Sequence, residues 1–382
     1  MPVCNSLSGQ NHDFGFLDQA IASLQSQTFT EFELLILDNQ SNDCTFEYCE
    51  KIARKDTRVK VFKDEARRSP EEAIRKLSEL SKYDYCAIVN DDDTWDDRYF
   101  EILISVLESN PSISLAYTNG RYLSPSGKRL GRIDAKRNLI YSSSSTCETN
   151  FHNYLKFRNP IPISFGLFRR KSFIESYPSK VFDSYGMNLD NIFIANFIRF
   201  GNSILHLDSD LFFYRNKKRA LHFDRLVGAQ TFTPCDILIR LVTHQLQVAA
   251  ELISSGNCHK SIINMDWANE EIILSTLKPI KHLISWVMVI FPLSHQEFNQ
   301  VKRFRKLIGE YTFNLSRYEN RKNHRTTTSG IIHDYLNHLK KSSENAFRES
   351  EKLRIPLQSL LKAISALQNE PLISRTNRDI AF

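Results

Sequence analysis

Several features that define other protein classes are missing from this sequence of 382 residues. Glycine and proline are scarce, with 12 of each, and 25% of the residues are charged, which excludes a collagen-like or disordered chain. No G-x-G-x-x-G or G-x-x-x-x-G-K-[ST] follows a strand pattern, and no G-x-S-x-G is present. An NAD-binding enzyme, a nucleotidyltransferase and a Ser/His/Asp hydrolase are therefore less favoured.

Paired cysteines and long apolar runs are missing as well. The seven cysteines are scattered, odd in number and without a C-x-x-C pair, so neither disulfides nor a zinc cluster is expected and the cytoplasm is the natural location. The most apolar stretch, Leu283 to Leu293, has roughly half of the ~20 residues of a membrane-spanning helix. It favours a buried helix over membrane-surface contact. No signal peptide is expected, because no basic segment precedes an apolar one at the N-terminus.

The charge of the chain limits its partners. The formal net charge is only +6, and it is not concentrated in one basic face. This balance is compatible with an anionic ligand, but a nucleic-acid partner is not expected.

Helix and strand patterns alternate in the first part of the chain. Helical spacing covers residues 16–27, 45–54, 97–108 and 189–199, and strand patterns cover residues 32–37, 59–62, 85–89, 113–122, 128–133, 163–168 and 203–214. Ser69, Pro70 and Glu72 predict a further helix that begins with a capping box. Strands separated by helices predict an α/β fold with a mostly parallel sheet. The pattern weakens between Ala135 and Asn159, where we expect a loop.

The second part of the chain has helical patterns without strands. They cover residues 236–252, 270–289, 295–308, 330–344 and 356–367. We therefore expect two domains, 1–228 and a helical region 229–382. Four interpretations of the helical region stay open: packing against the first domain, formation of a homo-oligomer, capture of the acceptor, and peripheral docking at the inner face of a membrane that carries a lipid-linked acceptor.

Carboxylates follow two of the predicted strands. Asp38 comes directly after residues 32–37, and Asp91, Asp92 and Asp93 come after residues 85–89. Ligands of parallel sheets bind beyond the carboxyl ends of the strands. Three adjacent carboxylates repel one another, and Mg²⁺ or Mn²⁺ joined to substrate phosphates relieves this repulsion. The plainer interpretation is a solvated acidic turn before the next helix.

Several short segments, in order, resemble family 2 glycosyltransferases. The similar segments are Met1–Asn5, Ile21–Leu34 with its Gln27-Thr28-Phe29, Asp38–Thr45, Asn90–Trp95, Gly166–Arg170, Leu189–Asn191 and Tyr214-Arg215. Together they span about the first 225 residues. The resemblance implies a GT-A type, Rossmann-like mixed sheet, mostly parallel and flanked by helices, followed by the helical C-terminal region.

The resemblance also implies an activity and a site. The chain would be an inverting, metal-dependent glycosyltransferase that moves a sugar from a nucleotide-sugar donor to a hydroxyl of a glycan or lipid-linked acceptor, in polysaccharide or cell-envelope assembly. Asp190 would be the general base, which receives the proton of the acceptor hydroxyl. The expected donor-binding residues are Pro2, Cys4, Asn5, Asp38, Asn90, Asp91 and Arg215. The expected ligands of Mn²⁺ or Mg²⁺ are Asp92, Asp93 and His222.

Two positions depart from the family pattern. Asn90 stands where the family has the first aspartate of its metal motif, and Leu189 stands where it has glutamate before the base. These departures favour a second hypothesis, in which the chain is a catalytically impaired scaffold or regulator that binds a nucleotide-sugar. For Asp190 itself, the plainer interpretation is an ordinary helix N-cap.

Overall fold

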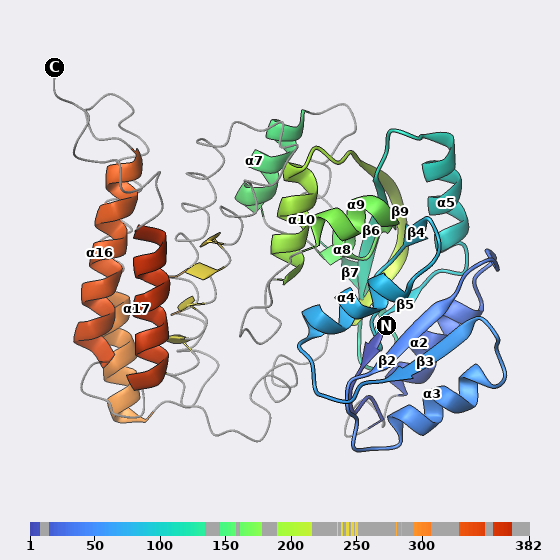
Figure 1. Cartoon of the computed structure of the whole chain (residues 1–382), viewed down its shortest axis with the longest axis horizontal. Coiled ribbons are helices and arrows are strands. Elements are labelled where there is room, and N and C mark those ends of the chain that lie inside the picture. Colours follow the sequence, from blue (N-terminus) through green and yellow to red (C-terminus); the bar gives the residue numbers. More distant parts are fainter. Residues whose placement is uncertain are drawn as a thin grey trace. The chain divides into compact units, whose positions relative to one another are not determined.

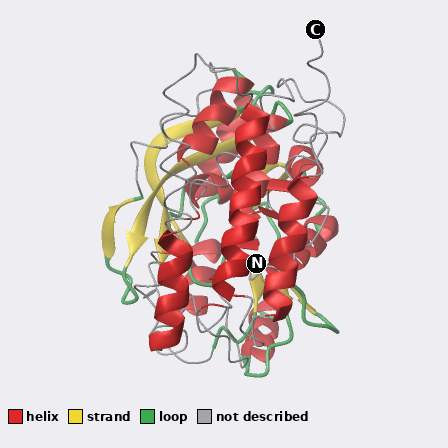
Figure 2. Cartoon of the chain, turned by 90° about the vertical axis from the view of Figure 1, so that its left-hand side faces the viewer, coloured by secondary structure: helices red, strands yellow, loops and turns green. Residues whose placement is uncertain are grey.

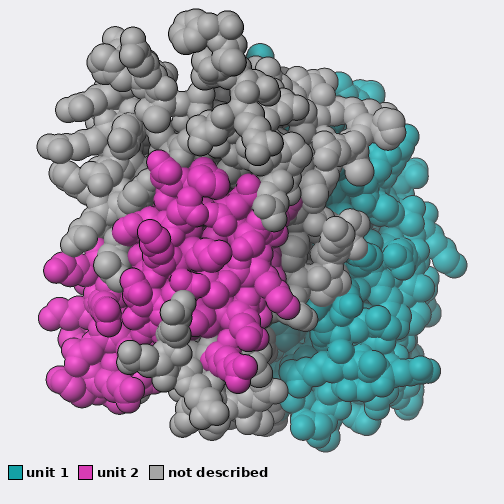
Figure 3. Space-filling view, turned by 60° about the vertical axis from the view of Figure 1, so that its left-hand side comes forward, with its two compact units in different colours: residues 1–226 teal, residues 227–382 magenta. Residues whose placement is uncertain are grey.

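The chain folds into two compact units, Met1–Leu226 and Val227–Phe382, which Figure 3 colours separately. The computed structural model describes residues 1–7, 15–133, 146–157, 161–177, 189–215, 294–306, 328–347 and 354–368, with single helical positions between 235 and 284. In the first unit, helices and strands alternate along the chain, and the strands form two sheets (Figure 1). The described part of the second unit is helical.

The first sheet is parallel and has the order β1-β2-β3, formed by β1 (Pro2–Val3), β2 (Leu34–Asp38) and β3 (Val59–Lys63). The register aligns Val3 with Asp38 and Asp38 with Lys63, so the carboxyl ends of the three strands lie together. All residues of β2 are buried. A parallel strand that is covered on both faces reads as a continuous apolar run, which is why residues 32–37 predicted it.

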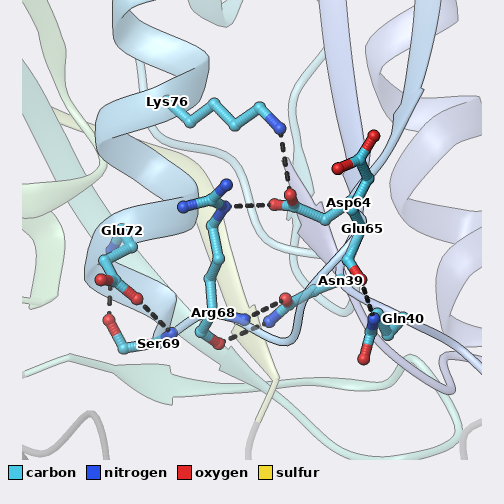
Figure 4. Close-up of polar contacts among 8 residues, drawn as sticks. All are labelled: Asn39, Gln40, Asp64, Glu65, Arg68, Ser69, Glu72 and Lys76. Carbon is cyan, nitrogen blue, oxygen red and sulfur yellow. Dashed lines mark hydrogen bonds and ion pairs between the residues drawn. The ribbon is translucent and has the colours of Figure 1, made fainter.

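Helix α3 (Thr45–Ala53) connects β2 to β3, and helix α4 (Pro70–Leu80) follows β3; both pack against this sheet. Leu35 and Leu37 of β2 pack against Ala73 and Leu77 of α4. The predicted capping box at the start of α4 is confirmed. The hydroxyl of Ser69 accepts the N–H of Glu72 at 3.2 Å, and the carboxylate of Glu72 accepts the N–H of Ser69 at 3.0 Å (Figure 4).

The second sheet is mixed and has the order β4-β8-β6-β9-β5, with β7 paired to β6. Its strands are β4 (Tyr85–Cys86), β5 (Thr94–Trp95), β6 (Leu115–Leu123), β7 (Arg129–Arg132), β8 (Leu167–Arg169) and β9 (Ile204–Arg215). The β6–β9 pair is parallel and the other pairs are antiparallel. The α/β class is therefore confirmed, with the sheet divided into a parallel part and a mainly antiparallel part.

Helices α2 (Phe16–Gln25) and α5 (Tyr99–Ser109) belong to the same unit and pack near the second sheet. Helices α7 (Cys147–Phe157), α8 (Ile161–Ser164) and α9 (Arg170–Ser176) gather around α10 (Leu189–Arg199). The prediction of a helix over residues 189–199 is confirmed.

Two expectations about this region were wrong. The loop expected over Ala135 to Asn159 contains α7, whose buried residues Phe151 and Tyr154 are three positions apart on one helix face. The strand expected over residues 163–168 begins only at Leu167, after the short helix α8. Residues 134–145 of the expected loop lie outside the described residues.

The second unit contains a helical segment over residues 295–306, α16 (Thr328–Phe347) and α17 (Arg354–Gln368). Helices α16 and α17 lie side by side (Figures 1 and 2). The helices predicted over residues 330–344 and 356–367 are confirmed. Those predicted over residues 236–252 and 270–289, and the stretch Leu283 to Leu293, lie mostly outside the described residues. In the part of the chain that the structure describes, no helix has the length and apolar character needed to cross a bilayer.

Candidate active site

The segment that follows β1 joins the loops after two other strands. The backbone N–H of Asn5 donates to the hydroxyl of Ser41 at 2.9 Å, and the side-chain oxygen of Asn5 accepts the N–H of Asn42 at 2.8 Å. The hydroxyl of Ser6 donates to the carboxylate of Asp91. Residues 4–7 therefore connect the loop after β2 with the loop after β4.

Asp38, the last residue of β2, lies at the centre of this arrangement. Its side chain is completely buried, and its Oδ2 accepts the N–H of Ser41 at 3.2 Å. Its Oδ1 is also buried and has no hydrogen-bond partner among the described residues. An unsatisfied buried acceptor costs about 1–3 kcal/mol. A buried acceptor of this kind at the carboxyl end of a strand is a candidate position for a ligand that donates a hydrogen bond.

The acidic run after β4 divides into two parts. Asp93 is completely buried, and its two carboxylate oxygens accept the side-chain amide of Asn90 at 2.9 Å and the backbone N–H of Arg215 at 2.8 Å. Asp91 and Asp92 are partly exposed. The carboxylate of Asp93 is thus directed at protein groups, whereas Asp91 and Asp92 lie where solvent or a ligand reaches them.

Arg215, the last residue of β9, fixes this acidic loop from the other side. It is 2% exposed, and its guanidinium lies 4.5 Å from the ring centre of Phe16. Its Nε donates to the backbone oxygen of Asp92 at 2.6 Å. The other guanidinium nitrogens donate to Ser124 O, Pro125 O and Gln19 Oε1. Burial lowers the pKa of Arg215, and Asp92 and Asp93 oppose this effect.

Because these protein groups engage the guanidinium, we interpret Arg215 as a residue that positions the acidic loop. A direct contact of Arg215 with the donor, which the family resemblance implied, would compete with those bonds.

Asp190 lies in the first turn of α10. The side chain of Asp190 is outside the described residues, but later residues of α10 pack against the second sheet. Phe193 and Phe197 pack against Phe168 of β8, with ring centres 5.2 and 5.3 Å apart. Phe168 pairs with Cys86 of β4, the strand that leads to the acidic run. One sheet therefore carries both the acidic run and the seat of α10.

The structure brings most of the predicted site residues to one region. Hydrogen bonds and strand pairing connect the ends of β1, β2, β4 and β9, which carry Pro2, Cys4, Asn5, Asp38, Asn90, Asp91, Asp92, Asp93 and Arg215. His222 lies outside the described residues, as does the side chain of Asp190. Within the described ranges, no group of three or more His, Cys, Asp or Glu side chains is arranged to hold a metal ion.

Sequence reasoning missed three residues of this region. Gln19 reaches Arg215 from α2, Asn39 follows Asp38, and Asp64 follows β3 directly. Asp64 carried a signal, because it is an acid at the end of a strand, as Asp38 is. Gln19 carried none, since its partner is 196 positions away in the sequence.

Comparison with known proteins gives one family. The model described as Glycosyl transferase family 2 matches residues 1–176. An uncharacterized protein of Sinorhizobium fredii (strain NBRC 101917 / NGR234), y4gI, is 26% identical over 135 residues. The aligned part is 34% of this chain and 15% of that protein, so the chain spans only a small fraction of this relative's length.

Solved structures show the same fold. S. aureus TarS 1–349 in complex with UDP-GlcNAc has a TM-score of 0.54, 11% sequence identity, and coverage of 96% of this chain and 90% of that chain. The same protein in complex with UDP has a TM-score of 0.51 and 11% identity, with coverage of 96% and 89%. At this identity the likeness shows the fold, and it confirms the GT-A type architecture.

Proposed function

Because the model of glycosyl transferase family 2 matches residues 1–176 of this chain, we propose that it is an inverting glycosyltransferase. It moves a sugar from a nucleoside-diphosphate sugar to a hydroxyl of a glycan or lipid-linked acceptor, in the assembly of a polysaccharide or cell-envelope glycan. We place it in the cytoplasm, including the inner face of the membrane. The crystal structures of TarS with UDP-GlcNAc and with UDP support a nucleotide-sugar as the donor.

The observation that carries this proposal is the buried Oδ1 of Asp38, which has no hydrogen-bond partner in the part of the chain that the structure describes. A base N–H or a ribose hydroxyl of the donor would supply the missing hydrogen bond. Pro2 is paired beside β2, and Cys4 and Asn5 follow it in the segment that is bonded to the loop after β2. These residues would surround the nucleoside.

The diphosphate would lie over the acidic run. Mg²⁺ usually binds through one or two carboxylates and substrate phosphates, so a complete ligand cage is not required. Asp92, with Asp91 beside it, fits this pattern because both are partly exposed. Asp93 stabilises the conformation of this loop, because both of its carboxylate oxygens accept hydrogen bonds from protein groups. A bound Mg²⁺ or Mn²⁺ would neutralise charge on the departing nucleoside diphosphate.

Asp190 would act from the start of α10. The acceptor oxygen forms a bond to the anomeric carbon, and its proton passes to the carboxylate of Asp190. The bond between the anomeric carbon and the diphosphate oxygen breaks, and the electron pair leaves with the nucleoside diphosphate. A single displacement from the opposite side inverts the anomeric configuration.

Donor binding is tested by thermal unfolding of the full chain with UDP-, GDP-, ADP- and CDP-sugars and Mn²⁺. A bound donor raises the melting temperature, because it binds the folded state alone. Asp38→Asn should weaken binding of the best donor by roughly 10-fold or more, since a hydrogen bond to a charged group contributes about 1.5–3 kcal/mol. Asp97→Asn, at an exposed aspartate, is the matched control. Failure of every donor to stabilise the wild-type protein would refute the proposal.

Turnover separates the enzyme from a scaffold that only binds the donor, a hypothesis that Asn90 favours because it is not a carboxylate. Donor hydrolysis that requires Mn²⁺ or Mg²⁺ and is abolished by Asp190→Asn supports the enzyme. Donor binding without any hydrolysis or transfer supports the scaffold.

A further inference from the structure

The loop of residues 64–69, between β3 and α4, is fastened to the end of β2 (Figure 4). The side chain of Asn39 makes two hydrogen bonds with the backbone of Arg68. Its Nδ2 donates to the Arg68 oxygen at 2.8 Å, and its Oδ1 accepts the Arg68 N–H at 2.7 Å. Asn39 is 8% exposed. This one side chain therefore fixes the far end of the 64–69 loop.

Two further bonds fasten the near end of the loop. The backbone N–H of Asp64 donates to the carbonyl of Asp38 at 2.9 Å. The side chain of Gln40 donates to the carbonyl of Glu65 at 2.5 Å. Gln40 has a φ of 57°, in the left-handed region that residues other than glycine rarely adopt. The chain therefore accepts a strained backbone at the position from which Gln40 reaches the loop.

A buried carboxylate holds the loop in shape from within. The side chain of Asp64 is 1% exposed, and it accepts Nε of Arg68 at 2.6 Å and Nζ of Lys76 at 3.1 Å (Figure 4). The two ends of the loop are thus bonded to each other through Asp64 and Arg68, and Asp64 is also bonded to Lys76 of α4. All of these contacts lie at the carboxyl edge of the parallel sheet, next to Asp38.

We propose that Asn39 is a positioning residue for the donor, which holds the 64–69 loop as a wall of the nucleoside pocket beside Asp38. This inference rests on the proposed function. Asn39 follows Asp38 directly, and the buried Oδ1 of Asp38 has no hydrogen-bond partner among the described residues. A wall that is fixed before binding lowers the ordering cost of binding and so raises the affinity. Because Asn39 bonds to the loop backbone, its effect does not depend on the loop side chains.

Calorimetry of the full chain with UDP, GDP, ADP and CDP, each with Mn²⁺, tests the inference. For the tightest of the four, Asn39→Ala should raise Kd roughly 5- to 20-fold, because two hydrogen bonds to the loop are lost. Asn39→Asp keeps the acceptor for the Arg68 N–H, so its Kd should be intermediate. Binding of inorganic pyrophosphate with Mn²⁺ should stay unchanged in both, since pyrophosphate has no nucleoside. In turnover assays, the donor KM should rise while kcat stays within about twofold.

Two more variants complete the design. Gln40→Gly removes the bond to Glu65 but allows the left-handed backbone, so it should weaken nucleotide binding without lowering the melting temperature. Asn42→Ala, at an exposed asparagine of the loop after β2, should leave the Kd of the nucleotide unchanged.

The outcomes separate the two claims. If the wild-type protein binds none of the four nucleotides, the proposed function is overturned. If it binds one, but the Asn39 and Gln40 variants bind that nucleotide equally well, or lose nucleotide and pyrophosphate affinity alike, the positioning role of Asn39 alone is overturned.

Discussion

At the scale of single residues, the site depends on polar side chains that are bound by the protein itself. The buried guanidinium of Arg215 donates to acceptors in three different segments, and both carboxylate oxygens of Asp93 accept hydrogen bonds from protein groups. The sequence predicted that Arg215 and Asp93 belong to the site. It did not predict that they act on its framework, because their partners come from distant strands and no local pattern encodes those contacts.

Arg215→Lys tests this framework role. A lysine keeps the charge, but it has no planar fork that reaches several carbonyls at once. We expect the free energy of unfolding in urea to fall by about 2–4 kcal/mol, since several buried acceptors lose their donor. Arg54→Lys, at an exposed arginine of the same unit, should change it by less than about 0.5 kcal/mol. Unchanged stability of Arg215→Lys together with lost donor affinity would instead indicate a direct contact with the donor.

Asp64 gives a pH dependence to the 64–69 loop. Burial raises the pKa of Asp64, but the hydrogen bonds from Arg68 and Lys76 outweigh burial and lower its pKa below the ordinary value. A lowered folded pKa adds stability above the unfolded pKa of about 3.9, and this stability is lost as the pH falls through the folded value. The free energy of unfolding in urea should therefore fall less between pH 7 and pH 3 in Asp64→Asn than in the wild type. Equal losses would contradict this assignment.

At the scale of elements, local signals predicted the helices and strands that carry their own boundaries. The capping box of α4 and the apolar run of β2 are such signals. The pair α8 and β8 was misjudged, because Gly166 ends the helix to let two strands approach closely. A Cβ at Gly166 would lie 2.7 Å from the carbonyl oxygen of Ala116. That constraint comes from β6, about fifty positions earlier in the chain, so residues 163–168 alone could not reveal it.

The aromatic seat of α10 links this element to catalysis. Phe193 lies one turn after Asp190 and packs on Phe168, Phe173 and Tyr177. Phe193→Leu should lower kcat by roughly tenfold, because a displacement of about 1 Å at a reacting group is costly. The Kd of the donor should change less than kcat, since Asp38, which would bind the nucleoside, belongs to the other sheet. Leu substitution of the exposed Phe298 is the control. A loss of donor affinity that matches the loss of kcat would contradict a selective effect on the base.

At the scale of the whole molecule, the chain has two units with separate cores. The first has the buried residues of both sheets, and the second has buried leucines on α16 and α17, among them Leu336 and Leu360. The sequence predicted this division from the loss of strand patterns after about residue 230. It could not predict what the second unit does, because helical periodicity shows which face is apolar and not which surface that face meets.

Because each unit has its own core, we expect calorimetry of the full chain to show two unfolding transitions. A saturating nucleoside diphosphate with Mn²⁺ should shift only one transition to higher temperature. The free energy of unfolding of that unit should rise by about 2.7 kcal/mol at a ligand concentration of 100 times Kd. Leu336→Ala creates a cavity beside α16 and should shift only the other transition to lower temperature. The free energy of unfolding of that unit should fall by about 2–5 kcal/mol. If both changes move the same transition, the donor site and the helical unit are coupled in folding. In that case the two units unfold as one cooperative unit, and the expectation of two independent transitions is wrong.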